Sequence, residues 1–329
     1  MTTREHINDY FNGRPFMVLC ALALMAATAV ALSMGVQPAH ADSTGLFFPL
    51  KGRLIEHGPL SAFINVACLL ATGGIMLALN KVFSYVRAVT HLFVSAFFLL
   101  QVANPAALVS FNAGTLMALV TALATMPLFA SYQDRHSQRS IFLIFTLVAT
   151  GSMFHYGFLM LIPAFLLGFL NMGVLNLKGL LAMLFGLVTP FWIVLGLGIV
   201  HPADFIMPHI NGIWTLTGQP WTNLVLVLAV VTALLGIVLA VMNLMTIMNY
   251  RMQTRVYNAF FVFVLVMAVI AICIDYSNVA VYLPLLGLMT AVQIAHFHTL
   301  RNTFQYRYIF ILLLIAGCVG LFAANVFMP

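Results

Sequence analysis

The sequence predicts an all-α, polytopic helical membrane protein with about 11 transmembrane helices, some of them short or re-entrant. Of the 329 residues, 63% are hydrophobic and only 6% are charged, whereas roughly a quarter of the residues of an ordinary soluble domain are charged. No soluble fold could bury that much apolar surface. Apolar segments succeed one another from residue 16 to residue 328 without a polar block large enough to fold alone. We therefore expect one integral membrane domain over residues 1–329.

Each predicted helix is an apolar run close to the length that crosses a membrane. A hydrocarbon core about 30 Å thick requires roughly 20 residues of helix. The segments 88–103 and 140–154 are shorter than that, so they are candidates for tilted or re-entrant elements, which are tolerated where protein surrounds them. The eleven segments are 16–36, 60–80, 88–103, 106–129, 140–154, 156–174, 178–200, 223–248, 257–275, 278–298 and 308–328.

Basic residues predict the orientation, because Lys and Arg are enriched in the cytoplasmic connections of membrane proteins. With the N-terminus in the cytoplasm and the C-terminus outside, only Lys51 and Arg53 lie outside. A missing crossing would move every later basic residue to the other side. The predicted cytoplasmic residues are Arg4, Arg14, Lys81, Arg87, Arg135, Arg139, Lys178, Arg251, Arg255, Arg301 and Arg307.

The first predicted helix also resembles a signal peptide, because Ala39-His40-Ala41 follows it in the pattern of a cleavage site. The apolar run of about 20 residues is longer than the 7–15 residues usual for the core of a signal peptide. We therefore expect the first helix to be retained.

Composition and motifs exclude several classes of function. The formal charge of +6 and the pI near 9.3 come from basic residues scattered between apolar segments, which orient helices and predict no nucleic-acid partner. Glycine-rich phosphate loops, G-x-S-x-G, C-x-x-C and H-E-x-x-H do not occur in the sequence. We therefore expect no cofactor and no metal site.

The connection 37–59, predicted to lie outside, holds the first candidate site. Asp42 and Glu56 are the candidate catalytic carboxylates, since a carboxylate can act as general base at a membrane surface. Lys51, Arg53 and His57 are the candidate substrate-binding residues, because cationic side chains bind phosphate groups. Ordinary surface polarity and contact with anionic headgroups explain the same residues without any site.

Other polar residues give weaker signals. Asp204 with His201 and His209 forms a second cluster whose spacing matches no recognised zinc site. Asp275 is expected in a polar turn at the outer interface, where replacement by Asn would leave insertion and function intact. The polar residues expected within the apolar segments are Asn112, Asn171, Asn243 and Gln293.

Five short segments form a pattern: N-G-R-P-F (12–16), L-A-L-N-K (77–81), A-N-P-A-A-L (103–108), G-S-M-F-H-Y-G (151–157) and G-L-V-T-P-F (186–191). This pattern resembles an uncharacterised family of polytopic inner-membrane proteins from Bacteroidota, a domain of unknown function. The resemblance implies a multi-pass protein of the bacterial inner (cytoplasmic) membrane, and none of its motifs is a catalytic signature. At 178 this chain has Lys where the family pattern would have an Arg- and Trp-rich turn.

At the level of architecture, a first helix followed by a long outer connection and short paired helices is distantly similar to the GT-C membrane glycosyltransferases. That resemblance implies a polyprenyl-phosphate-linked sugar donor and a catalytic acid in the first outer connection, the place of Asp42 or Glu56. Three functions stay open. The leading one is a non-catalytic subunit or scaffold in cell-envelope biogenesis, with membrane lipids and other envelope membrane proteins as partners. The alternatives are a GT-C-like transferase and a transporter of lipids or small solutes.

Overall fold

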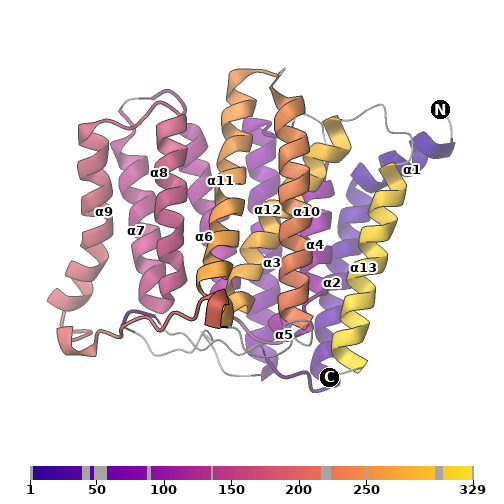
Figure 1. Cartoon of the computed structure of the whole chain (residues 1–329), viewed down its shortest axis with the longest axis horizontal. Coiled ribbons are helices and arrows are strands. Elements are labelled where there is room, and N and C mark those ends of the chain that lie inside the picture. The colour runs from indigo at the N-terminus through magenta and orange to yellow at the C-terminus, as the bar shows by residue number, and fades with distance from the viewer. Residues whose placement is uncertain are drawn as a thin grey trace.

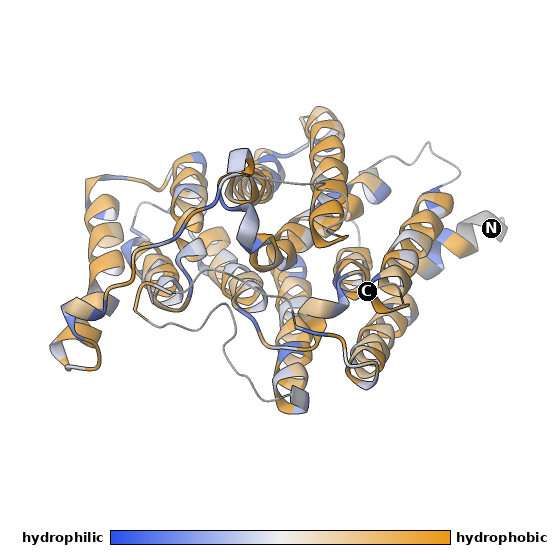
Figure 2. Cartoon of the chain, turned by 60° about the horizontal axis from the view of Figure 1, so that its bottom comes forward, coloured by the Kyte–Doolittle hydropathy of each residue, from blue (hydrophilic) through white to orange (hydrophobic). Residues whose placement is uncertain are grey.

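The computed structural model describes residues 3–38, 45–47, 58–86, 90–134, 136–215, 224–248, 250–300 and 307–327. These residues form helices joined by turns and loops, and no β-strand. Figure 1 shows the long helices running between two ends of one bundle, with α9 at one edge and α13 beside α2 at the other. Most of the helical ribbon in Figure 2 has the colour of hydrophobic residues. The predicted all-α architecture is confirmed for the described residues.

Eight helices among the described residues are long and apolar enough to cross a membrane. They are α2 (Arg14–Ser33), α3 (Gly58–Phe83), α6 (Ala113–Ala130), α9 (Leu177–Gly196), α10 (Leu224–Ile247), α11 (Met252–Ile274), α12 (Val279–Leu300) and α13 (Arg307–Phe327). The shorter elements are α1 (Thr3–Asn12), α4 (Leu92–Val102), α5 (Pro105–Leu108), α7 (Gln138–Phe154), α8 (Leu161–Asn171) and the 3₁₀ turns η1 (Tyr156–Met160), η2 (Pro202–Asp204), η3 (Ile213–Thr215) and η5 (Tyr276–Asn278).

Each of the eleven predicted segments overlaps a helix, but the segment 106–129 is not one continuous helix. α5 ends at Leu108, and α6 begins after Asn112, whose side-chain oxygen accepts a hydrogen bond from the Thr115 N–H at 3.0 Å. The side chain of Asn65, in α3, donates to the carbonyl oxygens of Ala107 and Leu108 at 2.9 and 3.2 Å. These bonds satisfy backbone groups that the break leaves free, as a low-dielectric interior requires.

α12 is the central helix of the bundle, because it packs against α4, α6, α10 and α11 and its span is buried throughout. Gly114 of α6 permits one of these contacts. A Cβ atom at Gly114 would lie 2.3 Å from the carbonyl oxygen of Val281 in α12. At this position glycine lets the two helix backbones approach closely.

The two ends of the bundle differ in charge. We call one end the basic face: it carries α1, the first turns of α2, α7, α9, α11 and α13, and the last turn of α3 (Figure 1). The opposite face carries α5, the 201–215 connection and the turn after α11 (Figure 1). Every Lys and Arg of the described residues lies at the basic face: Arg4, Arg14, Lys81, Arg139, Lys178, Arg251, Arg255 and Arg307.

Candidate functional site

The five residues predicted as a site in the first long connection are Asp42, Lys51, Arg53, Glu56 and His57, and all of them lie outside the described residues. Residues 37–38, 45–47 and 58–59 of that connection are described. The N–H of Leu46 donates to the Ser152 carbonyl at 3.2 Å, and its carbonyl accepts from the Ile206 N–H at 2.8 Å. Part of the first connection therefore packs against the end of α7 and the 201–215 connection.

The second predicted cluster has a local structural role. The side chain of Asp204 accepts a hydrogen bond from the backbone N–H of His201 at 2.8 Å, and so caps the short turn η2. His209 contributes its backbone carbonyl to a contact with the hydroxyl of Tyr156. No group of three or more His, Cys, Asp or Glu residues that could hold a metal ion occurs among the described residues.

Asp275 is buried, although the sequence predicts it in a polar turn at the outer interface, where Asn could replace it. Its side chain is 2% exposed, whereas Asp9, Asp134 and Asp204 are exposed. Its Oδ2 accepts hydrogen bonds from the hydroxyls of Tyr156 at 2.6 Å and Tyr282 at 2.9 Å. The predicted polar turn is confirmed as η5, but it folds inward because these hydroxyls replace water around the carboxylate.

The same turn completes the shell of donors around the carboxylate. The amide nitrogen of Asn278 donates to both carboxylate oxygens, at 2.8 and 3.0 Å, and the Ser277 hydroxyl donates to Oδ1 at 3.2 Å. The N–H of Tyr276 donates to the Asn211 carbonyl at 2.9 Å. We call Asp275, Tyr156, Tyr282, Asn278 and Ser277 the carboxylate cluster. It ties the ends of α7, α11 and α12 to the 201–215 connection.

His155 lies between α7 and η1, beside the carboxylate cluster. Its Nδ1 accepts a hydrogen bond from the Gly157 N–H at 3.0 Å, so Nδ1 carries no proton. Burial lowers the pKa of His155 to about 4, although the Asp275 carboxylate acts in the other direction. A neutral imidazole that stacks on the Tyr156 ring, with centroids 5.1 Å apart, fits this position.

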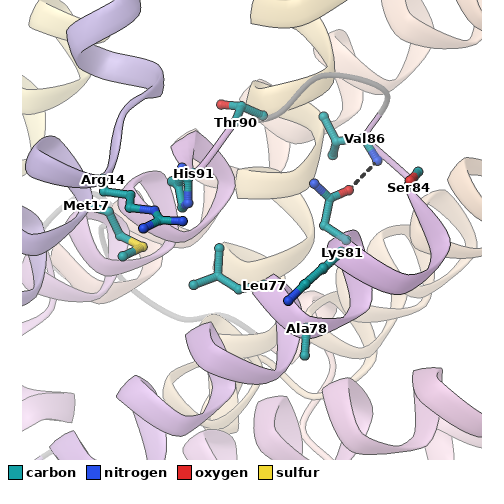
Figure 3. A pocket seen from close by; sticks show the side chains of 10 residues that line it. Arg14, Met17, Leu77, Ala78, Lys81, Ser84, Val86, Thr90 and His91 are labelled. Carbon is teal, nitrogen blue, oxygen red and sulfur yellow. Dashed lines mark hydrogen bonds between the residues drawn. The ribbon is translucent and has the colours of Figure 1, made fainter.

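A cavity of about 590 Å³ opens at the basic face between α2, α3 and the start of α4. Figure 3 shows the side chains of Arg14 and Lys81 directed into the same space from α2 and α3. None of the ten described residues that line the cavity is acidic: Arg14, Met17, Leu77, Ala78, Asn80, Lys81, Ser84, Val86, Thr90 and His91. We call this space the basic pocket.

Hydrogen bonds fix the walls of the basic pocket. The Asn80 side chain accepts from the Val86 N–H at 2.9 Å, which closes the turn after α3 (Figure 3). Asn12, just before α2, holds the start of α4: its carbonyl accepts from the His91 N–H at 3.1 Å, and its side-chain oxygen accepts from the Thr90 hydroxyl at 2.7 Å. These contacts within the chain position the helix ends that border the pocket.

From the sequence, Arg14 and Lys81 are predicted only to orient helices. The segments 12–16 and 77–81, which are distant from each other in the sequence, contribute residues to the same cavity. The segment 151–157 likewise contributes Tyr156 to the carboxylate cluster. The sequence alone could not indicate which distant segments of the chain these segments contact.

The buried amides of the interior bond to one another. Asn243 of α10 donates to the backbone and side-chain oxygens of Gln293 in α12, at 2.8 and 3.0 Å. Gln293 donates in turn to the Asn258 side chain of α11 at 3.1 Å. These contacts join three helices. Asn112 caps α6 and Asn171 is exposed at the end of α8, so neither lies in this network.

The chain matches no protein-family model, no curated protein and no solved structure. The geometry of the carboxylate cluster and of the interior amides is accordingly the basis for the proposed function.

Proposed function

We propose that this chain is a non-catalytic, multi-pass component of the bacterial inner membrane that serves as a subunit or scaffold in cell-envelope biogenesis. The observation that carries the proposal is the carboxylate cluster. Among the acidic residues whose side chains the structure describes, Asp275 is the buried one, and its oxygens accept from two tyrosine hydroxyls, an amide and a serine hydroxyl.

A general base must lie within hydrogen-bonding reach of a substrate proton. The Asp275 carboxylate is 2% exposed and bonds to donors from its own chain, which suits a structural role. The interior amides of Asn243, Gln293 and Asn258 likewise bond across three helices. Buried polar contacts of this kind favour a rigid bundle over a water-lined path.

The transferase and the transporter remain alternatives. A GT-C-like transferase would use Asp42 or Glu56, which lie outside the described residues. A transporter of lipids or small solutes is favoured by two buried nitrogens, Nδ2 of Asn258 and Nε2 of His296, which have no hydrogen-bond partner within the described part of the chain. Buried polar groups in membrane helices often mark a transport pathway.

The experiment distinguishes a function that needs only the presence of the chain from one that needs the carboxylates of Asp42 and Glu56. In the native bacterium, the gene is replaced by forms encoding Asp42→Asn, Glu56→Gln or both, and a strain lacking the chain serves as reference. Growth and envelope glycans are then measured at matched protein levels. Removal of a general base typically lowers a rate by about 10²–10⁴, so a transferase would show a clear loss.

The proposal predicts that the strain without the chain has a defective envelope and that all three carboxamide strains match the wild type. Mass spectrometry of the gently purified protein should then identify an envelope membrane protein in stoichiometric amount. Loss of glycans in the double-substitution strain would overturn the proposal in favour of the transferase. A chain that purifies without any protein partner would also contradict it.

A further inference from the structure

We infer that the basic pocket between α2, α3 and α4 binds the phosphate group of an anionic membrane lipid. Arg14 and Lys81 come from different helices and point into one cavity, and His91 lies on its wall (Figure 3). This inference concerns a ligand of the chain, and it does not depend on the proposed role in cell-envelope biogenesis.

The electrostatics of the cavity favour an anion. Two cationic side chains line it, and none of its described lining residues is acidic. α2 begins at Arg14 and α4 begins at Leu92, so the N-terminal ends of two helices border the same space. Helix N-termini carry a partial positive charge, but the last turn of α3 lines the same cavity with the opposite partial charge. The attraction for an anion therefore comes from the side chains of Arg14 and Lys81.

The remaining walls indicate that the phosphate belongs to a lipid. Met17, Leu77, Ala78 and Val86 line the cavity beside the cationic residues. The pocket lies at the end of apolar helices long enough to cross a membrane, the depth at which headgroups meet acyl chains. Basic pockets between membrane helices recognise anionic lipid headgroups in this way.

The role of basic residues in orienting helices does not explain why Arg14 and Lys81 line one cavity. Arg139 and Lys178 lie at the same basic face, at the starts of α7 and α9, and neither lines the pocket. A charge that only orients a helix has no need to share a cavity with another charge. These two residues therefore provide a matched control that removes the same charge from the same face.

The test measures binding of a tail-labelled, short-chain phosphatidate to the purified full-length protein in a neutral detergent, by fluorescence anisotropy. The variants are Arg14→Gln with Lys81→Gln, and Arg139→Gln with Lys178→Gln as control. Each lost contact should weaken binding about fivefold. The pocket variant should therefore raise the dissociation constant on the order of 25-fold, and the control should stay within about twofold of the wild type.

Competition on the wild-type protein supplies a second measurement that needs no variant. Unlabelled phosphatidate should displace the probe, whereas the matching diacylglycerol, which has the same tails without the phosphate, should not. Inorganic phosphate should compete only at far higher concentration, because it makes no contact with the apolar walls.

Three results would overturn the inference. Equal displacement by diacylglycerol would mean that the phosphate is not recognised, and equal weakening by the control variant would mean that the pocket is not the site. Displacement by inorganic phosphate at the same concentration as phosphatidate would assign the pocket to a soluble phosphate compound and not to a lipid. None of these results bears on the envelope role, which depends on growth and glycans.

Discussion

The hydroxyl of Tyr156 lies 2.6 Å from Oδ2 of Asp275, a residue 119 positions later in the chain. The same hydroxyl lies 3.2 Å from the carbonyl oxygen of His209. Three segments that are distant in sequence thus meet at one buried point of the opposite face. Since a buried carboxylate requires hydrogen-bond donors, this contact fixes the turn after α11 to the corner between α7 and α8.

Asp275→Asn is expected to destabilise the protein, because the substitution places an NH₂ group among donors that need an acceptor. Hydrogen bonds to a buried charged group contribute about 1.5–3 kcal/mol each, and unmatched donors add to the loss. We expect the free energy of unfolding to fall by about 2–4 kcal/mol. Unfolding of the purified protein in a denaturing detergent series measures this change.

Asp204→Asn is the control, since Asp204 is exposed and caps only the turn η2. It should change stability by less than about 1 kcal/mol. If Asp275→Asn proves as mild as this control, the carboxylate cluster does not stabilise the opposite face.

Gly114→Ala is expected to separate α6 from α12. The added methyl group would lie 2.3 Å from the Val281 carbonyl oxygen, which belongs to the backbone and cannot rotate away. Overpacking typically costs about 1–3 kcal/mol. Gly74→Ala is the matched helical control, because apart from its own helix turn no atom lies within 4 Å of the position of its Cβ. Equal thermal stability of the two variants would contradict the close contact between these helices.

The membrane-helix architecture could be predicted from the sequence because apolar composition and length alone select it. The break before Asn112 could not be predicted, since the sequence on both sides of it is apolar. The carbonyl groups of Ala107 and Leu108, which the break leaves free, accept from Asn65 of a different helix. A contact between segments 42 residues apart leaves no mark on local hydropathy. Helix existence was therefore predictable, and helix continuity was not.

The candidate sites were less predictable for the same reason. The sequence places Asp275 in a polar turn, but its burial depends on Tyr156 and Tyr282, which are ordinary aromatic residues in the sequence. Arg14 and Lys81 share a cavity only because α2 and α3 are neighbours at one end of the bundle. The burial of Asp275 and the approach of Arg14 to Lys81 therefore depend on the fold and not on the local sequence.

Gln293→Leu is expected to weaken the packing of α12 against α10 and α11. Its amide joins Asn243 to Asn258, and hydrogen bonds between membrane helices contribute about 0.6 kcal/mol on average, with a maximum near 1.7. A double-mutant cycle of Gln293→Leu with Asn243→Leu should give a coupling energy in that range. Additive effects of the two substitutions on unfolding would mean that the two amides do not stabilise each other.

We propose that the apolar helices cross the membrane with the basic face in the cytoplasm, as the positions of the basic residues predict. The most direct test places single cysteines in a functional variant in which Cys20, Cys68, Cys273 and Cys318 have been replaced. The two sites compared are His136, at the basic face, and Ile210, at the opposite face, and both side chains are exposed. With an impermeant thiol reagent, the account predicts labelling at 210 in intact spheroplasts and labelling at 136 only after lysis. Labelling at 136 in intact spheroplasts, with 210 protected until lysis, would contradict it.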